Sequence, residues 1–209
     1  MKYFSLIVLF ILFCCGNKED ILLSKADTTI VKNVDDLSPI YIFFRTKGKD
    51  TLAEVNRKNS IISTNWILNV DKRLPLRLAI PEIIKLQQKK REDKAHKNQK
   101  AENYYSYADT IGKNLAFIPF TNVFYKFSKP SNGGFLFYFK KGSDLVLINN
   151  IKMKRSEILN YLFSFNFAIN PKTVLILDRN MSFKEYLQIK ILTIELDTFN
   201  KEVPEEYIY

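Results

Sequence analysis

Two aspartates end two similar apolar segments and could act together as an acid–base pair. Asp71 follows the apolar segment 66–70, and Asp178 follows Val174–Leu177. Ligands bind at the carboxyl ends of strands in many α/β folds. Hydrolysis by two carboxylates would need their oxygens about 5–9.5 Å apart. The alternative, which the residue types favour, is that both aspartates cap strand-to-helix turns.

Other catalytic and metal-binding patterns are missing from the sequence. The single histidine, His96, lies in a lysine-rich stretch with no apolar residues to orient it for Ser-His-Asp chemistry. Both cysteines lie near the N-terminus, which excludes zinc sites of His and Cys from the rest of the chain. No phosphate-binding glycine motif occurs. We therefore predict a non-catalytic protein without metal or cofactor, and keep a hydrolase using Asp71 and Asp178 as an alternative.

The N-terminus carries the most informative pattern. Lys2 is followed by an apolar run from Tyr3 to Phe13 and then by Cys14 and Cys15. The run has the length of a signal-peptide core, about 7–15 residues, and is short of the roughly 20 that span a membrane. Ending in cysteine, it resembles a bacterial lipoprotein signal. The resemblance implies cleavage and anchoring through fatty acyl chains such as palmitate; an uncleaved N-terminal anchor is the alternative.

Cys15 is the better candidate for lipid attachment. A lipoprotein signal has an aliphatic residue three positions before the modified cysteine and a small residue directly before it. Leu12 and Cys14 meet this pattern for Cys15, whereas Phe13 is too bulky to precede a modified Cys14. We therefore predict a signal peptide over residues 1–14.

A short charged group follows the cysteines. Lys18, Glu19 and Asp20 resemble the surface-export tag of lipoproteins from the Bacteroidetes group, a lysine followed by two acids. The alternative is an ordinary solvated tether. The resemblance implies a lipid-anchored protein of the outer membrane, facing the cell surface or the periplasm, where nucleic acid is not a partner. Residues 15–38 are polar without a clear period, and we predict a flexible tether there.

Positive charge is concentrated in one segment. The formal net charge is +10, and residues 85–100 hold seven lysines and arginines against two acids. Without an apolar stripe, the segment 85–107 is predicted to be a solvated basic insertion or helix extension. Bases beside aromatic residues can bind a polyanion. The candidate residues for binding an anionic surface are Lys89, Lys90, Arg91, Lys94, Tyr104 and Tyr105.

The apolar patterns predict an α+β fold: a small mixed sheet with hairpins and strand–turn–helix units. In a first half, 39–84, strands are expected at 40–44, at 51–55 and within 61–70, followed by a helix from Leu74. In a second half, 108–209, we expect a hairpin turning at Gly142, a short helix after Ser156, a buried strand at 174–177, a helix capped by Ser182, and a last strand at 193–196.

Two twelve-residue segments share one pattern. Trp66–Arg77 and Thr173–Lys184 each contain an apolar strand, an aspartate with a base, and an apolar start to a helix. This similarity predicts two repeated halves.

The stretch 135–196 resembles the periplasmic domain of the ExbD/TolR family. The shared features are a hairpin with a glycine turn at Gly142, a short helix, a buried strand ending in Asp178-Arg179 and a helix opening at Phe183. The resemblance implies a small α+β fold and, as an alternative function, an accessory role in an energised transport complex. The acidic membrane helix of that family has no counterpart in the run 3–13. Our main prediction is a binding or assembly module whose partner is another envelope protein or an anionic surface.

Overall fold

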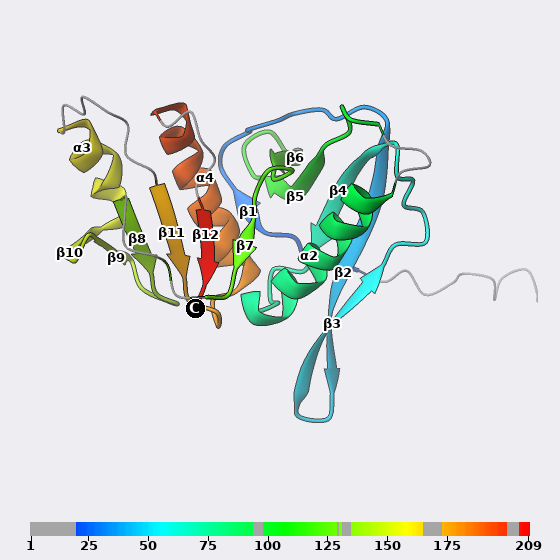
Figure 1. Cartoon of the computed structure of the whole chain (residues 1–209), viewed down its shortest axis with the longest axis horizontal. Helices are drawn as coiled ribbons and strands as arrows, with labels where there is room; N and C mark the ends of the chain where they lie inside the picture. The colour runs from blue at the N-terminus through cyan, green and yellow to red at the C-terminus, as the bar shows by residue number, and fades with distance from the viewer. Residues whose placement is uncertain (1–19, 94–97, 129, 131–134, 165–172, 200–204) are drawn as a thin grey trace, which may run out of the picture.

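The computed structural model describes residues 20–93, 98–128, 130, 135–164, 173–199 and 205–209. The chain has an α+β fold, as predicted from the sequence, with two mixed sheets of six strands each. Figure 1 shows the sheets side by side, with the long helices α2 and α4 near the centre of the molecule. No helix in the described ranges is long and apolar enough to cross a membrane.

The first sheet holds the N-terminal part of the chain. Its elements are β1 (Lys25–Ala26), β2 (Leu37–Lys47), β3 (Asp50–Asn56), β4 (Asn65–Val70), α2 (Leu76–Glu92), β5 (Asn103–Asp109) and β6 (Asn114–Pro119). The strand order is β1-β5-β4-β2-β3, and β6 also pairs with β5. Strands β2 and β3 form an antiparallel hairpin that turns at Gly48, whose φ of 62° suits glycine. Helix α2 connects the parallel strands β4 and β5.

The second sheet holds the C-terminal part. Its elements are β7 (Tyr125–Lys126), β8 (Phe135–Phe139), β9 (Leu145–Ile148), β10 (Ile151–Lys154), η1 (Arg155–Glu157), α3 (Ile158–Phe163), β11 (Thr173–Leu177), α4 (Phe183–Phe199) and β12 (Glu205–Ile208). The order is β10-β9-β8-β11-β12-β7, in which β8, β11, β12 and β7 run parallel. The hairpin β8–β9 turns at Gly142, with φ 67°.

The long helices bury the faces that their spacing predicts. On α2, Leu76, Ile80, Ile83 and Leu86 recur every three or four residues and are all buried. Pro81 lies inside α2, which continues past it. On α4, Ser182 caps the first turn together with Glu185, because Ser182 Oγ accepts from Glu185 N while Ser182 N donates to Glu185 Oε2. Side chains from both sheets and both helices form one hydrophobic core.

The two strand–turn–helix segments occupy matching places in the two sheets. Strand β4 pairs with β2 up to Val70, and β11 pairs with β8 up to Leu177. The next residues, Asp71 and Asp178, each donate a backbone N–H to the last paired residue of the neighbouring strand, at Ile42 O and Phe139 O. The strand order β5-β4-β2-β3 therefore has its counterpart in β12-β11-β8-β9.

The two halves meet at a seam of paired backbone, formed by residues 72–77 and 179–184. Leu76 N donates to Met181 O at 2.9 Å, and Phe183 N donates to Leu74 O at 2.7 Å. These two bonds join equivalent atoms of the repeated segments, so the seam has a local two-fold relation. Because each half satisfies the backbone of the other, the repeated segments form one folded unit.

Three sequence predictions about boundaries are wrong. The tether predicted over 15–38 is structured in its described part, because β1 pairs with β5 and Val31 pairs with Phe117. These hydrogen bonds join backbone groups, so the spacing of apolar side chains in the sequence does not indicate them. The boundary at 107/108 divides the first sheet, since β5 and β6 both belong to it. The last strand is β12, and the predicted strand at 193–196 lies within α4.

Candidate functional site

Several predicted site residues fall outside the described part of the chain. Cys15, Lys18 and Glu19 precede the first described residue, and Lys94 and His96 lie in the gap after α2. Asp20 is described and exposed. The predictions of lipidation and export therefore stay predictions.

Among the bases of the predicted polyanion site, Lys89 and Arg91 are exposed near the end of α2, but Lys90 is buried. Lys90 Nζ donates to Thr64 O at 2.9 Å, to Glu102 O at 2.9 Å and to Asn103 Oδ1 at 3.0 Å. Desolvation lowers the pKa of Lys90 to about 8. The prediction that Lys90 lies on a binding surface is wrong, because this lysine ties the end of α2 to the loops before β4 and β5.

The two predicted tyrosines point to opposite faces of β5. Tyr104 is half-buried and donates its hydroxyl to Glu102 Oε2, and burial together with this bond raises its pKa to about 12. Tyr105 is fully buried, with its ring stacked on Phe120 at 3.8 Å between centroids. The prediction of a surface role for Tyr105 is therefore wrong. Neighbouring residues of a strand face opposite sides, so Tyr104 and Tyr105 could not share one surface.

Tyr105 begins a buried chain of polar groups that crosses between the two halves. Its hydroxyl lies 2.6 Å from that of Tyr125, which lies 2.9 Å from that of Tyr186. Tyr186 donates to Glu206 Oε2 at 2.8 Å, and Lys190 Nζ donates to Glu206 Oε1 at 2.6 Å. Burial raises the pKa of the three tyrosines well above the usual range. Every member has a partner, as a stable buried polar network requires.

The two aspartates of the hydrolase alternative serve as turn residues. Both carboxylate oxygens of Asp71 accept hydrogen bonds from the Arg73 guanidinium, at 2.9 and 2.7 Å. Burial opposes ionisation of Asp71, but the bonds from Arg73 outweigh it and lower the pKa. Asp178 accepts from Asn180 N at 2.9 Å and from Lys141 N at 3.2 Å. These contacts match the capping interpretation of both residues.

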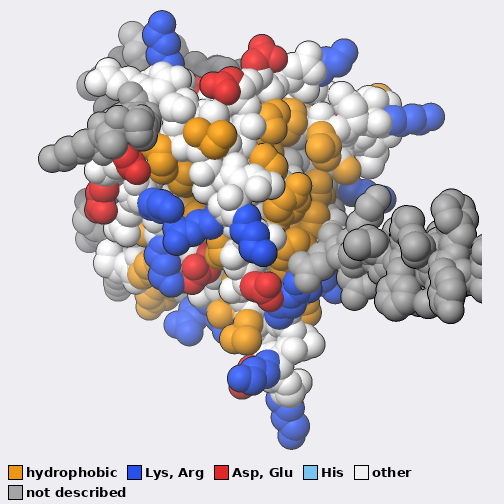
Figure 2. Space-filling view, turned by 90° about the vertical axis from the view of Figure 1, so that its right-hand side faces the viewer, with side chains coloured by type: hydrophobic (Ala, Val, Ile, Leu, Met, Phe, Trp, Pro, Cys, Tyr) orange, Lys and Arg blue, Asp and Glu red, His pale blue; other side chains and the backbone are white. Residues whose placement is uncertain are grey.

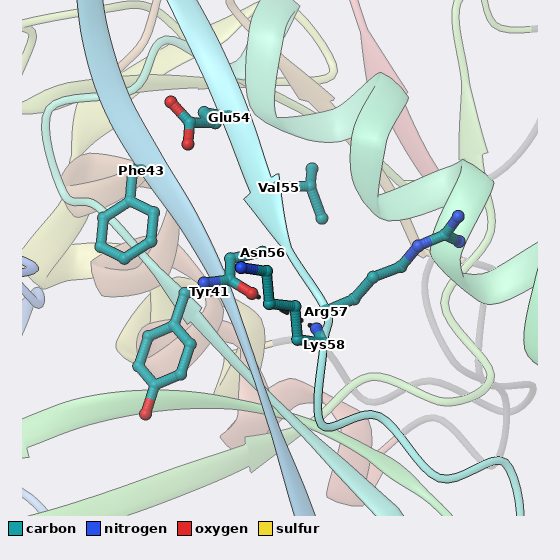
Figure 3. Close-up of a pocket in the computed structure, with 7 residues that line it drawn as sticks. All are labelled: Tyr41, Phe43, Glu54, Val55, Asn56, Arg57 and Lys58. Carbon is teal, nitrogen blue, oxygen red and sulfur yellow. Dashed lines mark hydrogen bonds between the residues drawn. The ribbon is translucent and has the colours of Figure 1, made fainter.

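An open hollow of about 860 Å³ lies over the β2–β3 hairpin and offers a mixed aromatic and polar surface. In Figure 3 the rings of Tyr41 and Phe43 lie on the same side of the strands as Glu54, whereas Val55 lies on the side of α2. The two rings stack at 5.9 Å with an interplanar angle of 12°. The lining residues are Tyr41, Phe43, Glu54, Val55, Asn56, Arg57 and Lys58.

Exposed leucines lie on the same strand face as the rings of this hollow. Leu37 on β2 is 46% exposed and Leu52 on β3 is 45% exposed, and both share the strand face of Tyr41. Figure 2, which looks onto the right-hand side of Figure 1, shows hydrophobic side chains gathered there among lysines and arginines. We name Leu37, Tyr41, Phe43, Leu52 and Glu54 the hairpin face.

None of the site residues predicted from the sequence belongs to the hairpin face, although the sequence carries a signal for it. Alternation along 37–43 and 52–56 places aromatic and apolar residues on both sides of the hairpin, whereas a sheet with one solvated face shows polar residues on that face.

In the described ranges no group of three or more His, Cys, Asp or Glu residues could hold a metal ion. Comparisons with protein-family models, with curated proteins and with solved structures find no match to this chain.

Proposed function

We propose that this chain is a non-catalytic, lipid-anchored module of the outer membrane or cell surface that binds another envelope protein through the hairpin face. The observation that carries the proposal is the exposure of Leu37 and Leu52 on the strand face that also holds the stacked rings of Tyr41 and Phe43. Contiguous apolar surface rimmed by polar residues marks interaction sites on soluble domains. Aromatic residues are also enriched where proteins bind each other.

The rim of the hairpin face supplies charge of both signs. Arg45 Nε donates to Glu54 Oε2 at 2.8 Å, and its guanidinium lies 4.8 Å from the centre of the Phe43 ring. Arg57 and Lys58 are exposed at the end of β3. A polar, charged rim around an apolar centre is the usual anatomy of an interface between two proteins that also exist apart.

Site-specific photo-crosslinking tests this function in the native membrane. A photoreactive residue at Leu52 should give a discrete crosslinked product from the anchored protein, and Tyr41→Ala should remove it. Leu147 on β9 is the matched control, because it is a similarly exposed strand leucine, 37% exposed, on the second sheet. Equal products from both positions, or none from Leu52, would contradict the proposal.

The prediction of a lipid anchor depends on the sequence alone, and a separate experiment tests it. Cys15→Ala should release the protein from the membrane fraction or leave an uncleaved precursor, whereas Cys14→Ala should change little. Normal anchoring of the Cys15→Ala protein would remove the lipoprotein interpretation.

A second candidate function is the accessory role in an energised transport complex. The observation in its favour is the element order of the second half: the hairpin β8–β9, the short helix α3, the buried strand β11 and the helix α4 opening at Phe183. This order agrees with the resemblance to the ExbD/TolR periplasmic domain. Co-purification with a membrane motor complex would separate this role from simple partner binding.

A further inference from the structure

A second hollow, of about 590 Å³, lies where α2 begins and the second sheet ends. In Figure 1 the end of the chain lies next to the first turn of α2. Arg77 comes from that turn, and Arg179 comes from the turn after β11. The lining residues are Arg77, Phe127, Arg179, Ile208 and Tyr209.

The backbone fixes the two arginines side by side. Arg77 N donates to Arg179 O at 2.8 Å, and Arg179 N donates to Tyr209 O at 2.9 Å. Both side chains are exposed, and no hydrogen bond or ion pair to either guanidinium occurs within the described residues. Since α2 begins at Leu76, the positive end of its helix dipole lies beside Arg77. The two guanidinium groups outnumber the single terminal carboxylate of Tyr209, so the hollow keeps a net positive charge that favours an anion.

The rest of the hollow is apolar and partly uncovered. Phe127, just after β7, is 51% exposed, and Tyr209 is 60% exposed. Ile208 closes the base and is only 2% exposed. Two exposed aromatic rings beside two exposed guanidinium groups form a surface with a charged part and an apolar part.

We propose that this hollow, which we name the arginine hollow, binds a small anion carried on an aromatic or aliphatic skeleton. Guanidinium groups bind carboxylate and phosphate through paired hydrogen bonds, which favours either group between Arg77 and Arg179. The skeleton would contact Phe127 and Tyr209. This site is separate from the hairpin face, and the proposal does not depend on the proposed function.

The local two-fold relation of the seam provides a matched control. Lys184 is the equivalent of Arg77, and Lys72 is the equivalent of Arg179, because Lys184 N donates to Lys72 O at 3.1 Å as Arg77 N does to Arg179 O. The lysine pair carries the same charge at the other end of the seam. It borders Leu22 rather than the aromatic residues Phe127 and Tyr209, since Lys72 N donates to Leu22 O.

Calorimetric titration with phenyl phosphate, phenylacetate and inorganic phosphate tests the proposal. We expect the folded protein to bind at least one of the two aromatic anions, and inorganic phosphate at least tenfold more weakly. The identity of the tighter aromatic anion distinguishes a phosphate ligand from a carboxylate ligand. Arg77→Gln with Arg179→Gln should weaken binding at least tenfold, whereas Lys72→Gln with Lys184→Gln should change it less than twofold.

Phe127→Ala separates the contribution of apolar contact to binding from the contribution of charge. It should weaken phenyl phosphate binding several-fold and leave inorganic phosphate binding unchanged. Thermal unfolding of each variant checks that the fold is retained, which the exposure of both arginines leads us to expect. The proposal is overturned by no binding of either aromatic anion at millimolar concentration, or by equal losses in the arginine and lysine variants. Neither result bears on the photo-crosslinking test at Leu52, because that test concerns the hairpin face.

Discussion

The two halves of the protein each bury a lysine on their long helix, but they stabilise it in different ways. Lys190 on α4 pairs with the carboxylate of Glu206 at 2.6 Å, and both side chains are buried. Lys90 on α2 bonds to two backbone carbonyls and an amide oxygen, and its Nζ lies 5.1 Å from the centre of the Trp66 ring. One cation is neutralised by a carboxylate, whereas the other is only solvated by polar oxygens and an aromatic ring.

The two lysines lie at different levels of their helices, because the equivalent of Lys190 on α2 is Ile83, about two turns before Lys90. The neighbouring strands also differ. Glu206 on β12 occupies the place that Tyr105 occupies on β5, because Leu175 pairs with Glu206 as Leu68 pairs with Tyr105. The second half therefore has a buried carboxylate where the first has a tyrosine. Similar backbones thus support different interior chemistry, and stability depends on charge differently in each half.

The largest effect is expected from Lys190→Met. Removing one member of a buried ion pair leaves Glu206 uncompensated, at a cost of about 3–5 kcal/mol in unfolding free energy. Adding Glu206→Gln should recover much of the loss, because the neutral amide still accepts from Tyr186. Urea unfolding of both single variants and the double variant measures the coupling. Additive losses would mean that the pair is not coupled.

Leu68→Ala and Leu175→Ala compare equivalent core positions in the two sheets. Both leucines are buried, with exposed fractions of 1% and 0%. Each substitution should cost about 2–5 kcal/mol through lost burial and a cavity. Because both residues belong to one core cluster, each variant should lower a single unfolding transition. Two separate transitions in calorimetry would instead mean that the halves unfold independently.

Lys90 should make the stability of the first half depend on pH. Its pKa is lowered from 10.5 to about 8, so between about pH 8 and 10 the unfolded chain binds more protons than the native chain. Stability should therefore rise across this window, by about 1–3 kcal/mol. Above pH 10 the slope reverses, because Tyr105 keeps its proton only in the native state.

Urea unfolding between pH 7 and 11 measures this dependence. Lys90→Met should remove the rise between pH 8 and 10 and keep the fall above pH 10. A rise of the same size in the Lys90→Met protein would assign the titration to another group.

The smallest effect is expected at the exposed bases of the same helix. Lys89→Gln should change the unfolding free energy by about 0.5 kcal/mol or less. Arg91→Gln should cost about 1 kcal/mol, because Arg91 donates to Thr121 O at 3.0 Å. If the outer face of α2 contacts an anionic surface, the two changes together should weaken vesicle binding, and the loss should shrink as salt rises. Pelleting with anionic vesicles measures the binding. Losses of several kcal/mol in folding would mean that these bases are structural, as Lys90 is.

Local patterns in the amino-acid sequence predict much of the fold. The spacing of apolar residues predicts α2 and α4, because a helix buries one face at a period of 3.6 residues. Glycine at position 142 predicts the β8–β9 turn, since a positive φ strains other residues. The similarity of Trp66–Arg77 to Thr173–Lys184 predicts a repeated unit, and these segments lie in matching places in the two sheets.

The tertiary structure decided which groups hydrogen-bond to the polar side chains. It also decided which groups bond to the backbone of segments that have no apolar period. Lys90 resembles its exposed neighbour Lys89 in the sequence, yet it turns inward because carbonyls of Thr64 and Glu102 lie within reach only in the folded chain. Ser24, in the predicted tether, is buried where β1 joins β5. Such partners are distant in sequence, so no local period marks them. Local sequence patterns determined the two long helices and the hairpins, whereas long-range hydrogen bonding decided where β1 and β12 form and that Lys90 is buried.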